Sequence, residues 1–540
     1  MKINKSSAFS QAVTLTIASV ILQILLFVYR IIITRFSGAG GMGIYQLAAP
    51  YYSILSSIAL SGITMSVTRL TVEKNAVNDA PAVKTVVRRS LQLFLTLLAV
   101  SAAVTFIFPD FIAGKILGNI QTKACMLLFI PCLFFTGFEN IYKSFFYGVK
   151  TVKPNIISEI SELCIRIIAI FILLYMNQNS LTTEKTAFLI VFGMIISEIF
   201  SFTFLGLYYK RYNKKSVGMT LAVAREVTPA RDFYPGDRKG RPYAKEQKSK
   251  NILSEIARIA VPISASSLLM TIITSVNTIL LPQRLVASGM SQTQAVETLG
   301  MLMGMAFPLV TIPAIFIGPV INVMFPRITS AIKLGDKKDM NDKIAKVFQS
   351  CSFMTFPAMG VVAAIGGPLC VLMYKNETAG SYILPLVLSS VFIYIQMITG
   401  SILYALDQQK KLAAYNFIDG VIHIIFTYFF VAMPNINVYG FMLGHLTSSF
   451  VGTVLNTVTV VKYSKIKINF TKWFVLPAVS GIYTGFMAHF IHNFCVRMSF
   501  APVVSVIISI LFSVLIYISI LQLRDISVVK YVKKLIRAKT

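Results

Sequence analysis

The sequence predicts an all-α membrane protein with 14 transmembrane helices, and three observations lead to this prediction. Hydrophobic residues make up 56% of the 540 residues, whereas only 13% are charged. The formal net charge is nevertheless +29, so the charges must be concentrated between the apolar stretches. Those stretches are about 20 residues long, which is enough for a helix to cross ~30 Å of hydrocarbon.

The apolar stretches follow one another along the whole chain. We expect helices at 12–34, 44–68, 90–109, 122–146, 155–176, 186–208, 253–281, 298–325, 344–373, 381–404, 412–432, 438–461, 473–494 and 501–522. The first stretch follows MKINKSS and is too long for the apolar region of a signal peptide. It also lacks a small-residue cleavage site, so we expect it to be retained as the first helix.

Lys and Arg alternate between rich and poor loops along the chain. Loops on one side carry 40 of these residues and loops on the other side carry seven. The other three are Arg30, Arg166 and Arg258, which lie inside or at the edge of the apolar stretches. The positive-inside rule therefore predicts that both termini are cytoplasmic. Basic loops that face an anionic leaflet explain the net charge, so we expect no nucleic-acid partner.

The chain contains an internal repeat with an offset of 257–258 residues. Pro50 and Arg69 correspond to Pro308 and Arg327, and each Arg is followed two positions later by Thr. Further matches pair Glu139 with Gln396, Glu162 with Asp419, and Arg166 with His423. Because six helices separate the copies, the repeats have the same orientation and are related by a pseudo-twofold axis along the membrane normal.

This repeat predicts two six-helix lobes around a central cavity, followed by two C-terminal helices. We assign the N-lobe, a basic cytoplasmic linker, the C-lobe, and the last two helices with a basic tail to residues 1–208, 209–252, 253–462 and 463–540. Two lobes around a cavity are typical of a transporter that exposes one site to alternate sides of the membrane.

The segment LFVYRIIITRFSGAGGMGIYQLAAPYYSI, at 26–54, carries a family resemblance. Its elements are Arg30, Arg35, a glycine-containing turn, Gly43 with Tyr45, and AAP at 48–50. With the 14-helix layout, they resemble the polysaccharide-transporter family of stage V sporulation protein B. That family belongs to the multidrug/oligosaccharidyl-lipid/polysaccharide exporter superfamily, which includes the MurJ-type lipid II flippases.

The resemblance implies flipping of an undecaprenyl-pyrophosphate-linked saccharide, such as a peptidoglycan precursor, from the inner to the outer leaflet of the bacterial cytoplasmic membrane. It also implies cell-wall synthesis enzymes as partners, beside the substrate and the membrane lipids. Two positions depart from the MurJ-type pattern. This chain has Gln23 and Met303 where MurJ-type flippases carry further cavity arginines.

Arginines near the helix ends are the candidate substrate-binding residues. Arg30 lies within an apolar span, which is costly unless the side chain faces a cavity or a partner. A guanidinium also matches the geometry of a phosphate. An interfacial Arg that extends to the headgroups is the alternative. The other candidate arginines are Arg35 and Arg284, for which a simple helix-end Arg is the alternative, and Arg69 and Arg327, for which topology-setting charge is the alternative. Gln23, at the position of a MurJ-type cavity arginine, is a further candidate.

Acidic residues within the spans suggest coupling to an ion. Glu162 and Arg166 have i, i+4 spacing, as do Asp419 and His423, so we interpret both as structural pairs. We find no local partner for Glu139, and we take Glu139 and Glu198 as the candidates for coupling, with a hydrogen-bonded structural acid as the alternative. The coupling ion would be Na⁺ or H⁺, and we expect no other cofactor or metal.

Two other function classes compete with the flippase. A cation-coupled multidrug or metabolite exporter would use unpaired acids and aromatic residues in its cavity. A membrane-embedded enzyme would need clustered acids, histidines or metal ligands near one surface. The histidines, at 423, 445, 489 and 492, form no such set, so we expect a protein that is not an enzyme.

Overall fold

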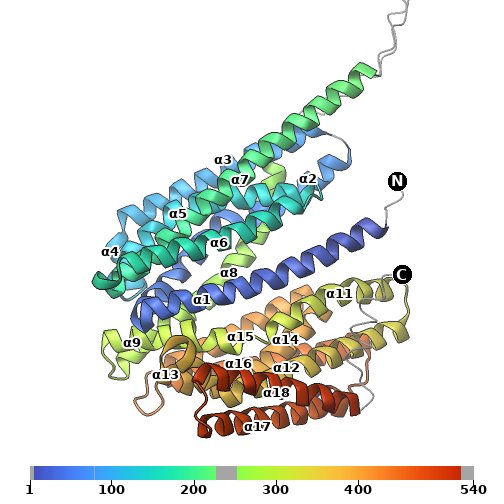
Figure 1. The fold of residues 1–540 in the computed structure, drawn as a ribbon. Helices are drawn as coiled ribbons and strands as arrows, with labels where there is room; N and C mark the ends of the chain where they lie inside the picture. Colours follow the sequence, from blue (N-terminus) through green and yellow to red (C-terminus); the bar gives the residue numbers. More distant parts are fainter. Residues whose placement is uncertain (1–4, 78, 227–251, 524–540) are drawn as a thin grey trace, which may run out of the picture. The chain divides into compact units, whose positions relative to one another are not determined.

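The computed structural model describes residues 5–77, 79–226 and 252–523, and these residues form helices without any β-strand (Figure 1). The first helices are α1 (Lys5–Ser56), α2 (Gly62–Ala76), α3 (Ala80–Ile107), α4 (Pro109–Phe111), α5 (Lys123–Gly148), α6 (Lys153–Met176), α7 (Thr183–Glu226) and α8 (Ile252–Ala287). The remaining helices are α9 (Gln292–Leu299), α10 (Phe307–Val310), α11 (Ala314–Lys333), α12 (Lys337–Tyr374), α13 (Glu377–Ser381), α14 (Ile383–Ala405), α15 (Gln409–Phe430), α16 (Val438–Ser464), α17 (Leu476–Arg497) and α18 (Pro502–Leu523).

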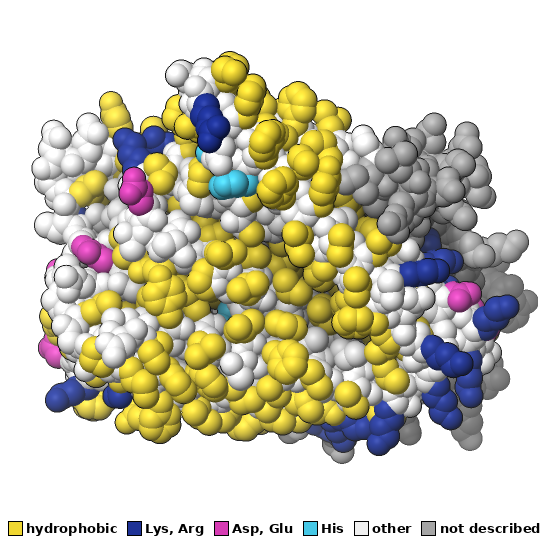
Figure 2. Space-filling model, turned by 90° about the horizontal axis from the view of Figure 1, so that it is seen from below, with side chains coloured by type: hydrophobic (Ala, Val, Ile, Leu, Met, Phe, Trp, Pro, Cys, Tyr) yellow, Lys and Arg dark blue, Asp and Glu magenta, His cyan; other side chains and the backbone are white. Residues whose placement is uncertain are grey.

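The all-helical prediction is confirmed, and the described residues form a multi-pass membrane protein. Eleven helices among them are long and apolar enough to span a bilayer. Figure 2 shows a face whose middle is covered by hydrophobic side chains, whereas Lys and Arg gather toward its ends. A helix forms all its backbone hydrogen bonds within the segment, and this is required in hydrocarbon, which offers no donors or acceptors.

The predicted number of 14 spanning helices is not confirmed, and three segments account for the difference. The first two predicted spans fall in one uninterrupted helical run, from α1 through the π-helical turn Ser57–Ser61 into α2, and α6 carries Glu159, Glu162 and Arg166 in its apolar stretch. The predicted span 298–325 is divided into a π-helical turn, Gly300–Ala306, followed by α10 and α11. Most of the predicted linker 209–252 and the tail after residue 523 lie outside the described residues.

A single glycine replaces the predicted turn between the first two spans. Gly38 has φ 64° and ψ −176°, whereas the residues on both sides of it remain helical. This backbone conformation is essentially restricted to glycine, because a Cβ would clash with the chain. The first two predicted spans therefore belong to two helical segments that join directly at a bend at Gly38.

The chain forms two compact units. The first unit comprises Met1–Tyr29 and Leu47–Ser275, and the second comprises Arg30–Gln46 and Val276–Thr540. Both α1 and α8 thus contribute residues to each unit. The division differs from the predicted lobe boundary at 253, and the assignment of the lobes by the sequence repeat remains a prediction.

In the first unit, α5 packs against α2, α3 and α7, and α6 packs against α7. Phe94 and Phe146 are fully buried in its core. Gly62 of α2 lies against α8, where an added Cβ would be only 2.1 Å from the Ala260 carbonyl oxygen. Ser57 adds hydrogen bonds to Ser267 and Thr271 of α8.

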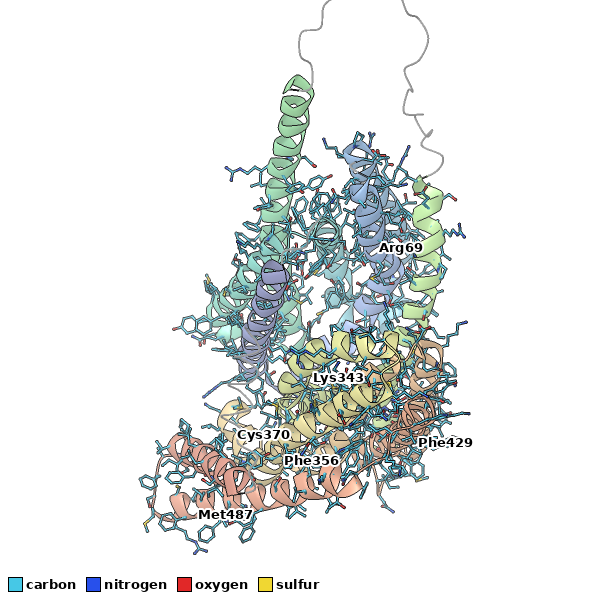
Figure 3. All side chains as sticks on the ribbon, turned by 90° about the vertical axis from the view of Figure 1, so that its right-hand side faces the viewer. Arg69, Lys343, Phe356, Cys370, Phe429 and Met487 are labelled. Atoms are coloured by element: carbon cyan, nitrogen blue, oxygen red, sulfur yellow. The ribbon has the colours of Figure 1, made fainter. Side chains whose placement is uncertain are left out.

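In the second unit, small residues allow backbones to approach closely at two places. A Cβ added to Gly300 would lie 1.9 Å from the carbonyl oxygen of Ala39, in the part of α1 that belongs to this unit. A Cβ added to Gly360 of α12 would lie 2.0 Å from the carbonyl oxygen of Gly481 in α17. Phe356 of α12, labelled in Figure 3, belongs to this second contact, since a Cβ added to Gly481 would lie 2.6 Å from its carbonyl oxygen.

The α12–α17 contact yields a prediction about stability. We expect Gly360→Ala to lower the thermal unfolding temperature of the purified protein in detergent, because the added methyl group overlaps the α17 backbone. Overpacking of this kind costs about 1–3 kcal/mol. The matched control is Gly367→Ala in the same helix, where a Cβ would meet nothing within 4 Å. Equal melting temperatures for the two variants would contradict the close contact.

Candidate functional site

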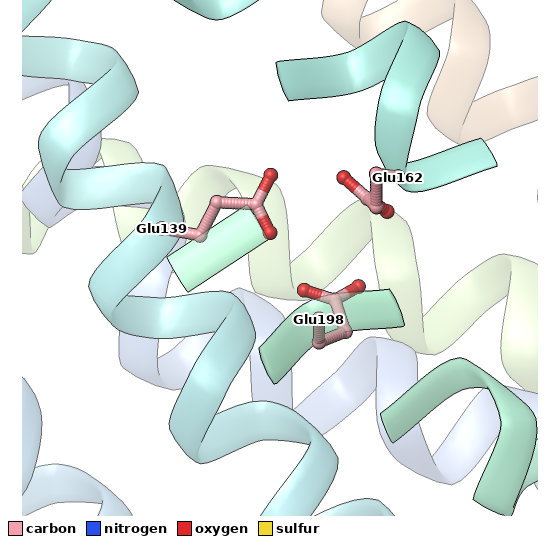
Figure 4. Close-up of side chains that lie close together, drawn as sticks. All are labelled: Glu139, Glu162 and Glu198. Atoms are coloured by element: carbon pink, nitrogen blue, oxygen red, sulfur yellow. The ribbon is translucent and has the colours of Figure 1, made fainter. Parts of the chain in front are cut away.

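Five charged side chains from three neighbouring helices meet in the first unit. α5 supplies Glu139 and Lys143, α6 supplies Glu162 and Arg166, and α7 supplies Glu198. The three carboxylates point toward one another in Figure 4. Glu139, Glu162 and Glu198 are only 2%, 8% and 5% exposed, so the cluster is withdrawn from both water and lipid.

Two cations hold the carboxylates together. Lys143 forms an ion pair with Glu139 and lies 3.7 Å from Glu162. Arg166 pairs with Glu162, and its Nη2 lies 2.9 Å from Oε1 of Glu198. Because each cation bridges acids on different helices, the cluster ties α5, α6 and α7 to one another.

Small polar residues next to the cluster keep the three helices close. Ser158 of α6 and Ser201 of α7 share a hydrogen bond of 2.5 Å about one turn away from the acids. Asn155 of α6 donates to the Lys143 carbonyl oxygen of α5 at 3.0 Å. Ser197 accepts from Arg166 Nε at 3.0 Å, which fixes the guanidinium between the two acids it contacts.

The three buried carboxylates exceed the two cations by one negative charge when these five groups are ionised. A fourth acid, Glu159, is half-buried, and its carboxylate lies 3.6 Å from Lys143 Nζ. Oxygens of Glu139, Glu162 and Glu198 lie within 4.8 Å of one another. Since like charges at this distance are unfavourable in a poorly solvated site, the arrangement can hold a proton or a monovalent cation.

Oε2 of Glu198 is the atom of the cluster best suited to bind this proton or cation. This oxygen is buried and has no hydrogen-bond partner among the described residues. A buried carboxylate oxygen without a donor is costly, and a bound proton or cation would relieve this cost.

The repeat-related positions also converge in the second unit, with different chemistry. Gln396 of α14 donates to Asp419 of α15 at 3.5 Å and to the Ser449 carbonyl oxygen of α16 at 2.9 Å. His423 lies next to His445, with ring centroids 5.2 Å apart. The second unit thus has one carboxylate where the first has three, and no Lys or Arg ion pair is described at this place.

Of the two pairs predicted from i, i+4 spacing, the described contacts include one. Glu162 and Arg166 form an ion pair, as their spacing predicts. No ion pair joins Asp419 to His423 among the described contacts, because His423 Nε2 bonds instead to the Phe441 carbonyl oxygen at 3.2 Å. The prediction that Glu139 lacks a local partner is wrong, because Lys143 follows it by four residues.

Lys143 belongs to the candidate site but is not among the site residues predicted from the sequence. It is one of the 40 Lys and Arg residues assigned above to loops, whereas it lies inside α5 with its side chain 13% exposed. The i, i+4 spacing that reveals Glu162 and Arg166 also links Glu139 to Lys143. The same rule applied to every acid in the spans would have found it.

The candidate substrate-binding residues do not form one cluster. Arg30 is exposed on α1, and no hydrogen bond or ion pair to it is described within its unit, while Gln23 is half-buried seven residues earlier. Arg35 lines a cavity in the second unit together with residues of α12, α13, α17 and α18.

Of the remaining three arginines, Arg284 lies in the last turn of α8, whereas Arg69 lies in the middle of α2 and Arg327 lies before the last turn of α11. Arg69 is exposed and forms an ion pair of 2.9 Å with Glu73 (Figure 3 labels Arg69). Arg327 is also exposed. Arg284 donates to the Tyr428 carbonyl oxygen at 2.9 Å and lies 4.2 Å above the Tyr428 ring, so its polar group is already engaged.

The ion-pair cluster yields a prediction about stability. We expect Arg166→Gln to destabilise the protein by about 3 kcal/mol or more, because removal of one partner leaves buried carboxylates uncompensated. Thermal unfolding in detergent would measure the loss, with Arg89→Gln, which removes an exposed arginine of α3, as the control. The double variant Arg166→Gln with Glu162→Gln should recover part of the loss. Equal stability of wild type and Arg166→Gln would contradict a compensated buried cluster.

Comparisons with known proteins extend over most of the chain. Sporulation protein YkvU of Bacillus subtilis (strain 168) is 22% identical over 87% of this chain and 98% of its own length. Stage V sporulation protein B of the same organism is 20% identical over 88% of both chains. Lipid II flippase MurJ of that organism is 22% identical over 76% of this chain and 74% of its own.

Solved transporter structures share the fold. Lipid II flippase MurJ in an inward closed conformation matches with a TM-score of 0.64 and 15% identity, over 95% of this chain and 99% of that one. An inward-facing multidrug resistance MATE family transporter of the MOP superfamily matches with a TM-score of 0.62 and 14% identity, over 84% and 100%. These neighbours are transporters and flippases rather than enzymes. A model of the polysaccharide biosynthesis protein family matches residues 9–332, more than half of the sequence, and the chain therefore belongs to that family.

Proposed function

We propose that this protein is an alternating-access transporter that flips an undecaprenyl-pyrophosphate-linked saccharide from the inner to the outer leaflet of the bacterial cytoplasmic membrane. Membership of the polysaccharide biosynthesis protein family and similarity to a lipid II flippase support this function. The saccharide is a peptidoglycan precursor or a related polysaccharide unit, and the sporulation proteins among the relatives agree with a role in cell-envelope synthesis.

Arg30 is the observation that carries the proposal. It lies in α1 eight residues before the Gly38 kink, or roughly 12 Å along the helix axis. No ion pair or hydrogen bond to it is described within its unit, although its charge reaches the buried hydroxyl group of Tyr374. An Arg without an ion pair in an apolar span is unfavourable unless a ligand or water solvates it. A guanidinium donates two parallel hydrogen bonds to a phosphate, so a lipid pyrophosphate is a suitable ligand.

The membrane orientation follows from the charges of the loops. In this orientation both termini are cytoplasmic, and the helical segments on the two sides of Gly38 cross the membrane once each. The chain then crosses the membrane 14 times. Most of the 40 Lys and Arg residues assigned to the alternate loops then face the cytoplasm, as the positive-inside rule requires, and Lys143 inside α5 is an exception.

The buried cluster of α5, α6 and α7 is the coupling site in this proposal. Its excess negative charge would be neutralised by one proton, accepted at Glu198 Oε2 and shared with Glu139. A proton fits better than Na⁺, because Lys143 and Arg166 already occupy carboxylate oxygens and would repel a second cation. Loading and release of this proton would change the balance of charges that holds the three helices together.

A cation-coupled exporter of drugs or metabolites is the second candidate. Aromatic side chains beside the acids favour it, since Phe138 and Phe202 have ring centroids 5.4 Å apart and Phe135 lies 5.8 Å from Phe202. Such surfaces attract organic cations. The unpaired Arg30 favours the flippase, because a cation repels cationic drugs.

One prediction of this proposal concerns the cargo. We expect wild-type protein in proteoliposomes to flip a fluorescent undecaprenyl-pyrophosphate saccharide, and Arg30→Gln to flip it at least tenfold more slowly. A hydrogen bond to a charged group contributes about 1.5–3 kcal/mol, which corresponds to this loss. Arg30→Lys should be intermediate, because an ammonium lacks the planar pair of donors.

The control is Arg89→Gln, which removes an exposed arginine of α3 whose one described side-chain hydrogen bond goes to Gln92. It should flip the lipid at the wild-type rate. Absence of flipping by wild type, with ion-driven export of an organic cation, would move the protein to the exporter class.

The second prediction concerns coupling. We expect an imposed proton gradient to accelerate flipping by wild type, and both Glu198→Gln and Glu139→Gln to abolish the acceleration while unstimulated flipping remains. Glu184→Gln, an exposed acid in the first turn of α7, is the matched control and should keep the response. Acceleration by a Na⁺ gradient instead would show that the cluster binds Na⁺, contrary to the assignment of a proton.

A further inference from the structure

A cavity of about 820 Å³ lies in the second unit and shares no residue with the ion-pair cluster. Its walls come from the C-terminal ends of α12 and α17, from α13, from the start of α18, and from Arg35 of α1. Helix ends that meet in this way lie at one boundary of the membrane, where lipid headgroups are found. A volume of this size holds a drug-sized molecule, and therefore also a lipid headgroup with its first carbons.

The polar side chains of this cavity carry an unbalanced positive charge. Arg35 and Lys375 are exposed cations, and the only acid in the lining is Glu377. No ion pair is described for any of these three residues. Lys375 is fixed in place as the left-handed residue (φ 56°) that ends α12. Two cations and one carboxylate leave a net charge of +1, which matches the single negative charge of a phosphodiester.

One ring nitrogen of a buried histidine in the lining has no hydrogen-bond partner among the described residues, while the ring also interacts with the backbone of Ser505. His492 of α17 is 9% exposed, and its Nδ1 atom is buried without a hydrogen-bond partner among the described residues. A buried ring nitrogen is unfavourable unless it is hydrogen-bonded. A phosphate oxygen or a glycerol hydroxyl group that entered the cavity would satisfy this nitrogen.

The rest of the lining is apolar and suits a hydrocarbon chain. Val496 of α17 and Val506 of α18 both line the cavity, next to the charged residues. An amphiphile with an anionic head and an acyl tail could place each part against side chains of its own polarity.

We propose that this cavity is a binding site for an anionic phospholipid of the surrounding bilayer. Arg35 and Lys375 bind its phosphate, His492 hydrogen-bonds to its headgroup, and the valines contact the first part of its acyl chains. With both termini cytoplasmic, the lipid belongs to the outer leaflet. Its single phosphodiester charge balances the cavity, whereas the pyrophosphate of the proposed cargo carries more negative charge than the lining compensates.

Native mass spectrometry and thermal unfolding of the detergent-purified protein test this site. Phosphatidylglycerol should bind saturably and raise the unfolding temperature, whereas phosphatidylcholine should do neither. The variant Arg35→Gln with Lys375→Gln should bind phosphatidylglycerol at least tenfold more weakly. The control Lys115→Gln with Lys185→Gln removes the same charge from the first unit and should bind as wild type does.

A second variant tests the apolar part without a change of charge. Val496→Trp adds bulk to the cavity wall at an exposed position and should also weaken phosphatidylglycerol binding. Equal binding of phosphatidylglycerol by wild type and the cavity variants would overturn the proposal, as would equal binding of the two phospholipids. Preferential binding of undecaprenyl pyrophosphate, lost in the same variants, would assign the cavity to the cargo instead. These measurements need no transport, so their outcome is independent of the flipping assay.

Discussion

Hydrocarbon offers neither hydrogen bonds to a backbone nor solvation to a charge, and the whole structure conforms to this constraint. Helices satisfy their own amides, and nearly all charged side chains are placed in the loops. Charges that remain inside the spans must be compensated by partners. Among the described residues of the first unit, Lys143 and Arg166 provide this compensation by bridging acids of three helices.

The cluster therefore has two roles that rest on the same contacts. Its ion pairs hold α5, α6 and α7 against one another, and its excess charge makes the site responsive to an ion. In the second unit, Gln396 and Asp419 occupy the positions that the repeat pairs with Glu139 and Glu162, and there a neutral amide replaces an acid. The repeated sequence thus keeps the position of a polar contact while the charge differs between the two copies.

Much of the fold was predictable from the sequence, because apolar length and loop charge report directly on the cost of burial in a membrane. The spans that became α3, α5, α12 and α16 are clear examples. The direct junction of two helical segments at Gly38 was not predictable. The glycines from Gly38 to Gly43 suggest a longer turn, and only the backbone torsions show that the chain bends at one residue. The π-helical turn at 300–306 likewise depends on contacts such as that of Gly300 with Ala39. For the candidate site, Glu162 with Arg166 followed from spacing, whereas the meeting of Glu139, Glu162 and Glu198 required the packing of three helices. The cavity around Arg35 and Lys375 joins residues that are 340 positions apart and left no local signal.

The kink at Gly38 also limits how the chain can vary in length. A conventional loop absorbs an inserted or deleted residue, but here helical residues lie directly on both sides of the bend. With 3.6 residues per turn, one extra residue would rotate everything that follows by about 100° and shift it by about 1.5 Å. Gly43, which fits against Val296, and the rest of α1 would then present the wrong face to their neighbours. The number of residues between Arg30 and Gly43 is thus constrained, because it fixes which faces of the two helical segments meet their neighbours.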